Sequence, residues 1–292
     1  MNQQEIKNWI LLLSLSIIWG SSFLFIKIAI ATVPPLTIVA GRTFFSAVLL
    51  ILLCIFMYLK YPKRKSFWIY CLVAAILGNC IPFSLISWGE EKVTSSMAGM
   101  LMSIMPLTTL MLSYLFLRNE VITKYKFIGF MLGFLGIVLL LSPNIQVSNN
   151  FLTDNILHKG AILLATVFYA ITSIIAKKYD QKEPIVTSAI VMVFALLVMT
   201  PFSLYFEQPW NIGFSTEALI SIFMLGIGGS AVGTVIYFKL ITDAGPTFFS
   251  LINYLIPIFA LIFGISFLNE VVTSREILGL LIILVGMYLS RY

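Results

Sequence analysis

The chain has 292 residues, of which 60% are hydrophobic and only 10% are charged. Soluble globular domains carry about 25% charged residues, so this composition excludes that class. The formal net charge is +6, but the uneven distribution of basic residues between the loops, described below, explains it without a nucleic-acid partner. We therefore expect a protein that is surrounded by a lipid bilayer.

Apolar segments of about 20 residues, long enough to cross a ~30 Å hydrocarbon core as helices, recur along the whole chain. Strands of a transmembrane barrel alternate over about 10 residues, so these segments are too long to be such strands. The sequence therefore predicts an all-α polytopic membrane protein. Its ten transmembrane helices are expected at residues 9–31, 36–59, 67–88, 94–117, 125–142, 157–177, 184–205, 217–240, 246–268 and 274–290.

The chain contains two copies of one unit. Asn119-Glu120-Val121 follows the fourth segment, and Asn269-Glu270-Val271 follows the ninth, 150 residues later. Each motif is preceded by a proline within its segment, Pro106 in the first copy and Pro257 in the second. The same spacing of 150 residues relates Trp19 to Tyr169, Lys27 to Lys177, Gly129 to Gly279 and Gly136 to Gly286. A repeat of this length predicts the architecture of the whole chain.

The repeat divides the chain into a first five-helix repeat at 1–142, an inter-repeat loop at 143–156 and a second five-helix repeat at 157–292. Because five is an odd number of crossings, the second repeat enters the membrane from the opposite face. Inverted repeats of this kind are common in secondary transporters, whose substrate site lies near the bilayer midplane between the repeats. We therefore expect transport by alternating access.

Basic residues in the loops predict the orientation. If the N-terminus is inside, thirteen Lys and Arg residues face the cytoplasm and three face the opposite side. The positive-inside rule then places both termini in the cytoplasm, and we expect the membrane to be a bacterial inner membrane. The thirteen are Lys7, Lys60, Lys63, Arg64, Lys65, Arg118, Lys124, Lys126, Lys177, Lys178, Lys182, Lys239 and Arg291, and the three are Lys92, Lys159 and Arg275.

Several short motifs in the first repeat carry a family resemblance. They are residues 19–23 (Trp-Gly-Ser-Ser-Phe) with Lys27, 40–45 (Ala-Gly-Arg-Thr-Phe-Phe), 88–91 (Trp-Gly-Glu-Glu), 105–107 (Met-Pro-Leu) and 118–120 (Arg-Asn-Glu). In this order they resemble an EamA-type member of the drug/metabolite transporter superfamily. The resemblance implies ten helices in two inverted halves, and transport of small metabolites, often amino acids moved outward.

Lys27 and Arg42 are the cationic side chains placed well inside predicted spans. A basic residue at the centre of a membrane helix costs ~2.5–3.5 kcal/mol on insertion scales, so it normally faces protein or a water-filled cavity. Either residue could bind the carboxylate or phosphate of an anionic substrate. The alternatives are that Lys27 extends to the outer membrane interface and that Arg42 caps helix ends or supports packing.

Corresponding spans of the two repeats are interrupted by small residues and proline. The third span contains Gly78 and Asn79, and the aligned positions of the eighth span are Gly229 and Ser230. Interruptions at matching positions of two halves point to a transport site, although they also serve ordinary helix packing. Asn79 is the sharper candidate because a buried amide needs hydrogen-bond partners, from the protein or from a substrate.

Aromatic residues near these interruptions predict the walls of a cavity. Trp19 lies near mid-span, where the usual role of tryptophan as an interface anchor does not apply. Asn253-Tyr254, one turn before Pro257, predicts a polar lining in the ninth span. The candidate substrate-binding residues are therefore Trp19, Ser22, Arg42, Asn79, Trp88, Tyr169, Ser230, Tyr237, Asn253 and Tyr254.

Several kinds of chemistry are missing from the predicted spans. They contain no nucleophile–base pair, no metal-ligand cluster and no phosphate-binding glycine loop, so we expect no enzyme activity and no cofactor. They also lack a central Asp or Glu, and we therefore hypothesise facilitated exchange, downhill export or coupling without an intramembrane carboxylate. A channel for small solutes is the alternative to a carrier, and the oligomeric state is not fixed by the sequence.

Overall fold

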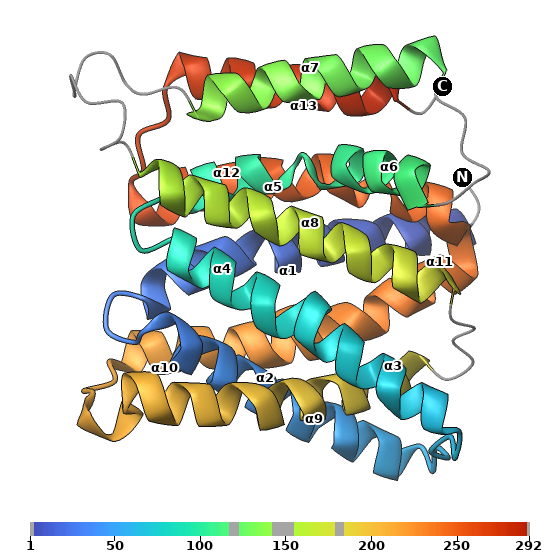
Figure 1. Cartoon of the computed structure of the whole chain (residues 1–292), viewed down its shortest axis with the longest axis vertical. Helices are drawn as coiled ribbons and strands as arrows, with labels where there is room; N and C mark the ends of the chain where they lie inside the picture. The colour runs from blue at the N-terminus through green and yellow to red at the C-terminus, as the bar shows by residue number, and fades with distance from the viewer. Residues whose placement is uncertain (1–2, 117–122, 142–154, 179–183, 291–292) are drawn as a thin grey trace.

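Apolar helices dominate the computed structural model, which describes residues 3–116, 123–141, 155–178 and 184–290 (Figure 1). No strand occurs in these residues. The inter-repeat loop predicted at 143–156 lies outside them except for its last two residues. The helices of the first half are α1 (Gln3–Ala29), α2 (Pro35–Phe56), α3 (Lys65–Ala75), η1 (Ile76–Cys80), α4 (Ile81–Gly89), α5 (Ser95–Met102), α6 (Met105–Phe116) and α7 (Lys124–Leu141).

The second half has a similar arrangement of helices, with two short extra segments, η2 and η3. Its helices are α8 (Ile156–Lys178), α9 (Pro184–Phe202), η2 (Ser203–Glu207), η3 (Pro209–Asn211), α10 (Thr216–Met224), η4 (Leu225–Val232), α11 (Gly233–Phe249), α12 (Ile252–Leu268) and α13 (Ser274–Leu289). The chain turns back inside α11 at Gly245, whose φ of 81° is a left-handed conformation that glycine adopts at low cost. The part of α11 before this turn ends one span, and the part after it begins the next.

The helices agree with the predicted spans. Eight stretches of the described residues are long and apolar enough to cross a bilayer, and α12 is a shorter apolar helix. Together with α13 they account for the ten predicted spans, so the all-α polytopic fold is confirmed. The eight are Gln3–Ala29, Pro35–Phe56, Lys65–Gly89, Ser95–Phe116, Lys124–Leu141, Ile156–Ala176, Pro184–Glu207 and Thr216–Ile241.

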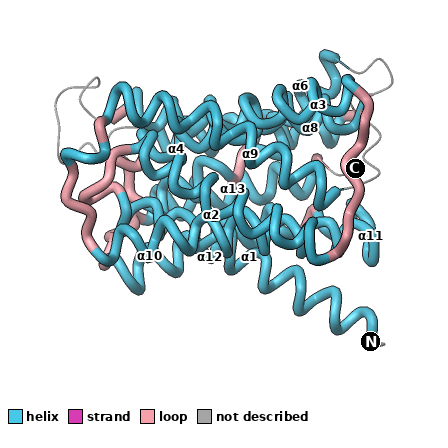
Figure 2. The backbone as a smooth tube through the Cα atoms, turned by 90° about the horizontal axis from the view of Figure 1, so that it is seen from below, coloured by secondary structure: helices cyan, strands magenta, loops and turns pink. Residues whose placement is uncertain are grey.

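Helix contacts follow the symmetry of an inverted repeat. Two equivalent helices pack directly on each other in two places, α2 with α9 and α7 with α13. The packing of α4 and α6 on α8 is matched in the other half by the packing of α11 and α12 on α1. In Figure 1, α7 and α13 form a pair at one edge of the bundle, and in Figure 2 the first turns of α1 extend beyond the other helices.

Glycines show that equivalent helices run in opposite directions. Gly129 of α7 lies against the backbone of Gly286 in α13, and Gly136 lies against Gly279. The residue numbers of the paired glycines rise along α7 as they fall along α13, so the two helices are antiparallel, as an inverted repeat requires. Small residues let the two backbones approach closely in a membrane, where apolar surfaces gain little by leaving lipid.

Gly136→Ala tests this contact. A Cβ at Gly136 would lie 2.7 Å from the Gly279 carbonyl oxygen and 2.6 Å from Ile283, so α7 and α13 must move apart. Overpacking of this kind costs ~1–3 kcal/mol, and we expect a lower melting temperature in detergent. Gly160→Ala is the control because nothing lies within 4 Å of the added atom. Equal melting temperatures for the two variants would contradict the close contact.

Candidate functional site

A cavity of about 430 Å³ lies between the two halves, and residues from both halves line it. Eight of the ten predicted site residues are among the lining residues. They are Trp19, Ser22, Arg42, Asn79, Tyr169, Ser230, Tyr237 and Asn253. The structure therefore brings together side chains from α1, α2, η1, α8, η4, α11 and α12 around one space of the size of a small metabolite.

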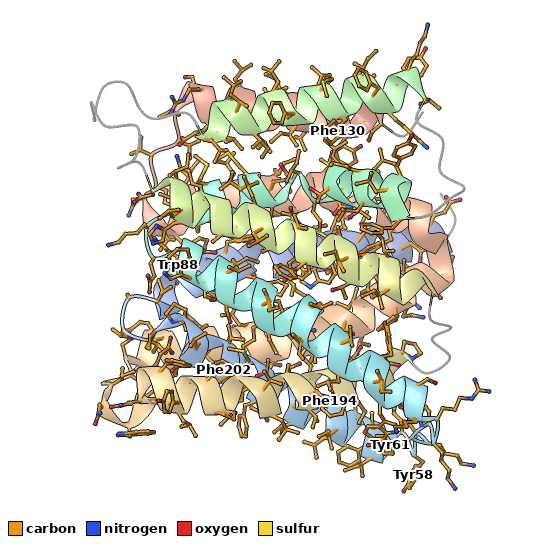
Figure 3. All side chains as sticks on the ribbon, in the orientation of Figure 1. Tyr58, Tyr61, Trp88, Phe130, Phe194 and Phe202 are labelled. Atoms are coloured by element: carbon orange, nitrogen blue, oxygen red, sulfur yellow. The ribbon has the colours of Figure 1, made fainter. Side chains whose placement is uncertain are left out.

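Trp88 and Tyr254 are not among the lining residues. Trp88 lies at the end of α4, where its side chain is 39% exposed and its ring stacks on His158 at 4.4 Å between centroids (Figure 3). Tyr254 packs against the hydrophobic core instead. It follows Asn253 by one residue, and successive residues of a helix point about 100° apart, so both cannot face the cavity equally.

The backbone is irregular where the predicted interruptions occur. Residues Ile76–Cys80 and Leu225–Val232 form π-helical segments, η1 and η4, at equivalent positions of the two halves. Gly78 and Asn79 of η1 and Gly229 and Ser230 of η4 all line the cavity. A π-helical segment widens the turn and frees backbone groups, and such segments are frequent at functional sites. Irregular backbone at membrane depth is tolerated where it lines a cavity.

Arg42 is the one charged residue among the described residues that line the cavity. Its side chain is 7% exposed, its Nε donates to Ser230 Oγ at 2.7 Å, and its guanidinium lies 3.7 Å from the centroid of the Phe83 ring. No hydrogen bond joins its two terminal nitrogens to another described residue. Met192, which stands 150 residues after Arg42 in the repeat, also lines the cavity but is apolar.

An aromatic group forms another part of the wall. Trp19 Nε1 donates to the carbonyl oxygen of Gly229 at 3.0 Å, so the indole satisfies a backbone group of η4. Tyr237 and Phe249 lie next to the indole, with ring centroids 6.3 and 6.2 Å away. A Cβ at Gly233 would lie 2.6 Å from Trp19 Nε1, so glycine is required there for the indole to reach the carbonyl.

Comparison with known proteins fits this architecture of two similar halves. The sequence profile of the EamA-like transporter family matches the chain twice, at residues 7–142 and 159–292. The chain belongs to this family. Membership makes it a membrane transporter and implies a small-molecule substrate and a surrounding lipid bilayer.

Relatives of this EamA-like transporter align along nearly its whole length. Protein PagO of Salmonella typhimurium is 26% identical over 284 residues, which cover 96% of this chain and 91% of PagO. The uncharacterized transporter YoaV of Bacillus subtilis is 23% identical, with 96% and 95% of the two chains covered. The uncharacterized inner membrane transporter YedA of Escherichia coli is 24% identical, with 95% and 88% covered.

A solved crystal structure has the same fold as this EamA-like transporter. The two share 16% sequence identity at a TM-score of 0.65, and the match covers 97% of this chain and 96% of the other.

Within the described residues, no group of three His, Cys, Asp or Glu side chains is placed to hold a metal ion.

Polar side chains at the helix ends were not identified from the sequence. Glu270 accepts from the amides of Ser95 and Ser96 at 2.7 and 2.8 Å and thereby caps the start of α5. Glu207 accepts from the amides of Leu36 and Thr37 at 2.9 and 2.7 Å and caps α2 in the same way. In both cases a carboxylate from the second half satisfies the free amides of a helix in the first half.

Lys27 bonds the backbone of the turn between α4 and α5. Its Nζ donates to the carbonyl oxygens of Glu90 at 2.5 Å and Val93 at 2.8 Å, and it is not among the residues that line the cavity. Both carbonyls belong to the turn between α4 and α5, so the ammonium group satisfies backbone groups at the end of a span.

Among the further lining residues that were not predicted are Ser103, Ser173, Thr234 and Phe249. Two of them stand four residues after a predicted one in a continuous helical stretch, Ser173 after Tyr169 in α8 and Thr234 after Ser230 across η4 and α11. Residues four apart share a helix face, so this periodicity is the signal that could have identified them.

Ser230→Ala is expected to destabilise the protein because it leaves the buried Nε of Arg42 without its acceptor. An unsatisfied buried donor costs ~1–3 kcal/mol, and more when it is charged. The measurement is the melting temperature of purified protein without added solutes. Ser173→Ala is the matched control, since that hydroxyl bonds only the Tyr169 carbonyl of its own helix. A smaller loss for Ser230→Ala than for Ser173→Ala would contradict the importance of this hydrogen bond.

Proposed function

We propose that this protein is a secondary transporter that moves a small metabolite, an amino acid or a related solute, out of the cell by alternating access. The observation that carries the proposal is the guanidinium of Arg42 in the central cavity. It is buried and held by Ser230 and Phe83, and no hydrogen bond joins its terminal nitrogens to another described residue. A planar guanidinium binds a carboxylate through two parallel hydrogen bonds, which makes this group a fitting anchor for such a solute.

The rest of the wall suits the other end of an amino acid. The described lining residues include no carboxylate, so an ammonium group would bind hydroxyl and amide oxygens and aromatic faces instead. Asn79 and Asn253 donate through their amide nitrogens to the backbone carbonyls of Ala74 and Ser250, which leaves their oxygens as acceptors. Trp19, Tyr169 and Tyr237 provide aromatic surface for the solute's side chain.

Alternating access follows if the two halves, 1–142 and 157–292, rock against each other around this cavity. Support comes from the inverted symmetry of the contacts and from the matching π-helical segments on both sides. The outward direction rests on the usual activity of EamA-type proteins, and a bacterial inner membrane agrees with the name of the relative YedA. Both termini lie in the cytoplasm under this proposal, in accordance with the excess of basic residues there.

Counterflow in proteoliposomes tests the proposal. Vesicles loaded with one unlabelled amino acid are mixed with a trace of the same labelled compound, and each amino acid is tested in turn. We expect saturable accumulation of one class. Arg42→Gln should lower the initial rate at limiting substrate at least about tenfold, because a hydrogen bond to a charged group contributes ~1.5–3 kcal/mol. Arg42→Lys should restore only part of this rate, since an ammonium group lacks the two parallel N–H donors of the planar guanidinium.

Lys239→Gln is the matched control. It also removes one positive charge, but Lys239 is exposed and pairs with Asp243 at 3.0 Å outside the cavity. Asn79→Ala should weaken exchange without affecting the fold. Exchange that persists in Arg42→Gln would keep the carrier and move its site elsewhere. Flux that never saturates would support the alternative, a channel for small solutes.

A further inference from the structure

A buried carboxyl group lies where α4 ends and the chain turns toward α5. Glu90 is the first residue after α4, and its side chain is 0% exposed. Neither of its carboxylate oxygens has a hydrogen-bond partner among the described residues, and the hydroxyls of Ser95 and Ser96 nearby in the chain are likewise buried without one. Buried polar groups are nearly always hydrogen-bonded, so a carboxyl group left alone in this way requires an explanation.

The groups that could stabilise an ionised Glu90 have other partners. Lys27 directs its ammonium group to the backbone carbonyls of Glu90 and Val93, and the first amides of α5 donate to Glu270. Glu270 adds a second carboxylate to the same region, which disfavours a further negative charge. The pKa of Glu90 is therefore raised well above its usual range, mainly by burial and also by Glu270, while Lys27 opposes this shift.

A carboxyl group in such surroundings is neutral rather than charged, because burying an unpaired ion costs more than binding a proton. Two contacts join elements at this end of the bundle: Lys27 of α1 donates to the turn after α4, and Glu270 after α12 accepts from the first amides of α5. Glu90 is buried in the same turn, and we call this end closed when both contacts are made. Separation of α1 and α12 from the turn would break both contacts and admit water to Glu90.

We propose that Glu90 is a proton-binding site, which takes up one proton when this end of the transporter closes and releases it when this end opens. On closing, the carboxylate accepts a proton from water and becomes a carboxylic acid. On opening, the hydrated acid returns the proton to water, and the resulting carboxylate is solvated by water. No other reactant is needed.

The pH dependence follows by linkage. The closed end binds more protons than the open end at any pH between the ordinary pKa of a glutamate, ~4.3, and the raised pKa of Glu90. Within this window a rise in pH shifts the equilibrium toward the open end, by up to about tenfold per pH unit for a single proton. The ionisable groups that act on Glu90 are Lys27 of α1 and Glu270, and the same turn also carries the exposed Glu91 and Lys92; His158 of α8 stacks on the neighbouring Trp88.

This site deepens the proposed function and rests on it in one respect: if the protein transports by alternating access, each opening of this end moves a proton. The sequence-based hypothesis was facilitated exchange, downhill export or coupling without an intramembrane carboxylate. Glu90 is compatible with the last of these, since it follows the end of the span, yet the bundle buries it completely.

Infrared spectroscopy of the purified protein tests the site without any substrate. At neutral pH we expect the carbonyl stretching band of a protonated carboxylic acid, lost in Glu90→Gln and retained in Glu91→Gln, the exposed neighbour. Glu90→Gln keeps the shape of the neutral acid, so its melting temperature should equal or exceed that of the wild type. Absence of the band in the wild type, as a bound sodium ion would cause, or its persistence in Glu90→Gln would overturn the proposal.

Hydrogen exchange followed by mass spectrometry tests the link to opening. After correction for the intrinsic effect of pH, peptides from the α4–α5 turn should exchange faster as pH rises in the wild type and in Glu91→Gln. In Glu90→Gln this dependence should be lost, and Glu90→Asp, which still titrates, should keep it. An equal pH dependence in Glu90→Gln would overturn the proposal. Failure of amino acid counterflow would instead overturn the proposed function, while both of these measurements would still decide the proton site.

Discussion

Every backbone amide and carbonyl inside a bilayer must find its hydrogen bond within the protein, and this constraint determines how the two halves meet. Helices satisfy it along their length but leave free groups at their ends. Glu207 and Glu270 from the second half accept from the first amides of α2 and α5, and Lys27 donates to the carbonyls that follow α4. Helix packing, such as that of α7 on α13 and α2 on α9, joins the halves along their length. Glu207 and Glu270 add contacts at helix ends between the halves, and Lys27 makes one within the first half.

The same requirement explains the centre of the molecule. The π-helical segments η1 and η4 interrupt the regular helix, and the cavity lies where they do. The Trp19 indole donates a hydrogen bond to one of the carbonyls of η4, and the hydroxyl of Ser230 accepts a hydrogen bond from the Nε of Arg42. The space for a solute and the means of satisfying the irregular backbone are therefore built from the same residues.

Much of this arrangement could be predicted because the sequence repeats itself. The aligned interruptions at Asn79 and Ser230 predicted both the irregular segments and two of the residues that line the cavity. The misplacement of Trp88 and Tyr254 has a different origin, since the rotation of a helix about its axis depends on packing that a hydrophobic run of this kind does not specify. The burial of Glu90 could not be predicted because it depends on contacts between segments distant in the chain.

The difference between Arg42 and Met192 breaks the symmetry of the cavity. Two identical halves would present the same chemistry to a solute arriving from either side of the membrane, and binding would be equally strong from both. With one cation on one half, a bound solute has a fixed orientation relative to the bilayer, and its affinity can differ between the two faces. Such a carrier still obeys the concentration gradients, but it can be kinetically rectified, faster in one direction than in the other at the same solute concentration.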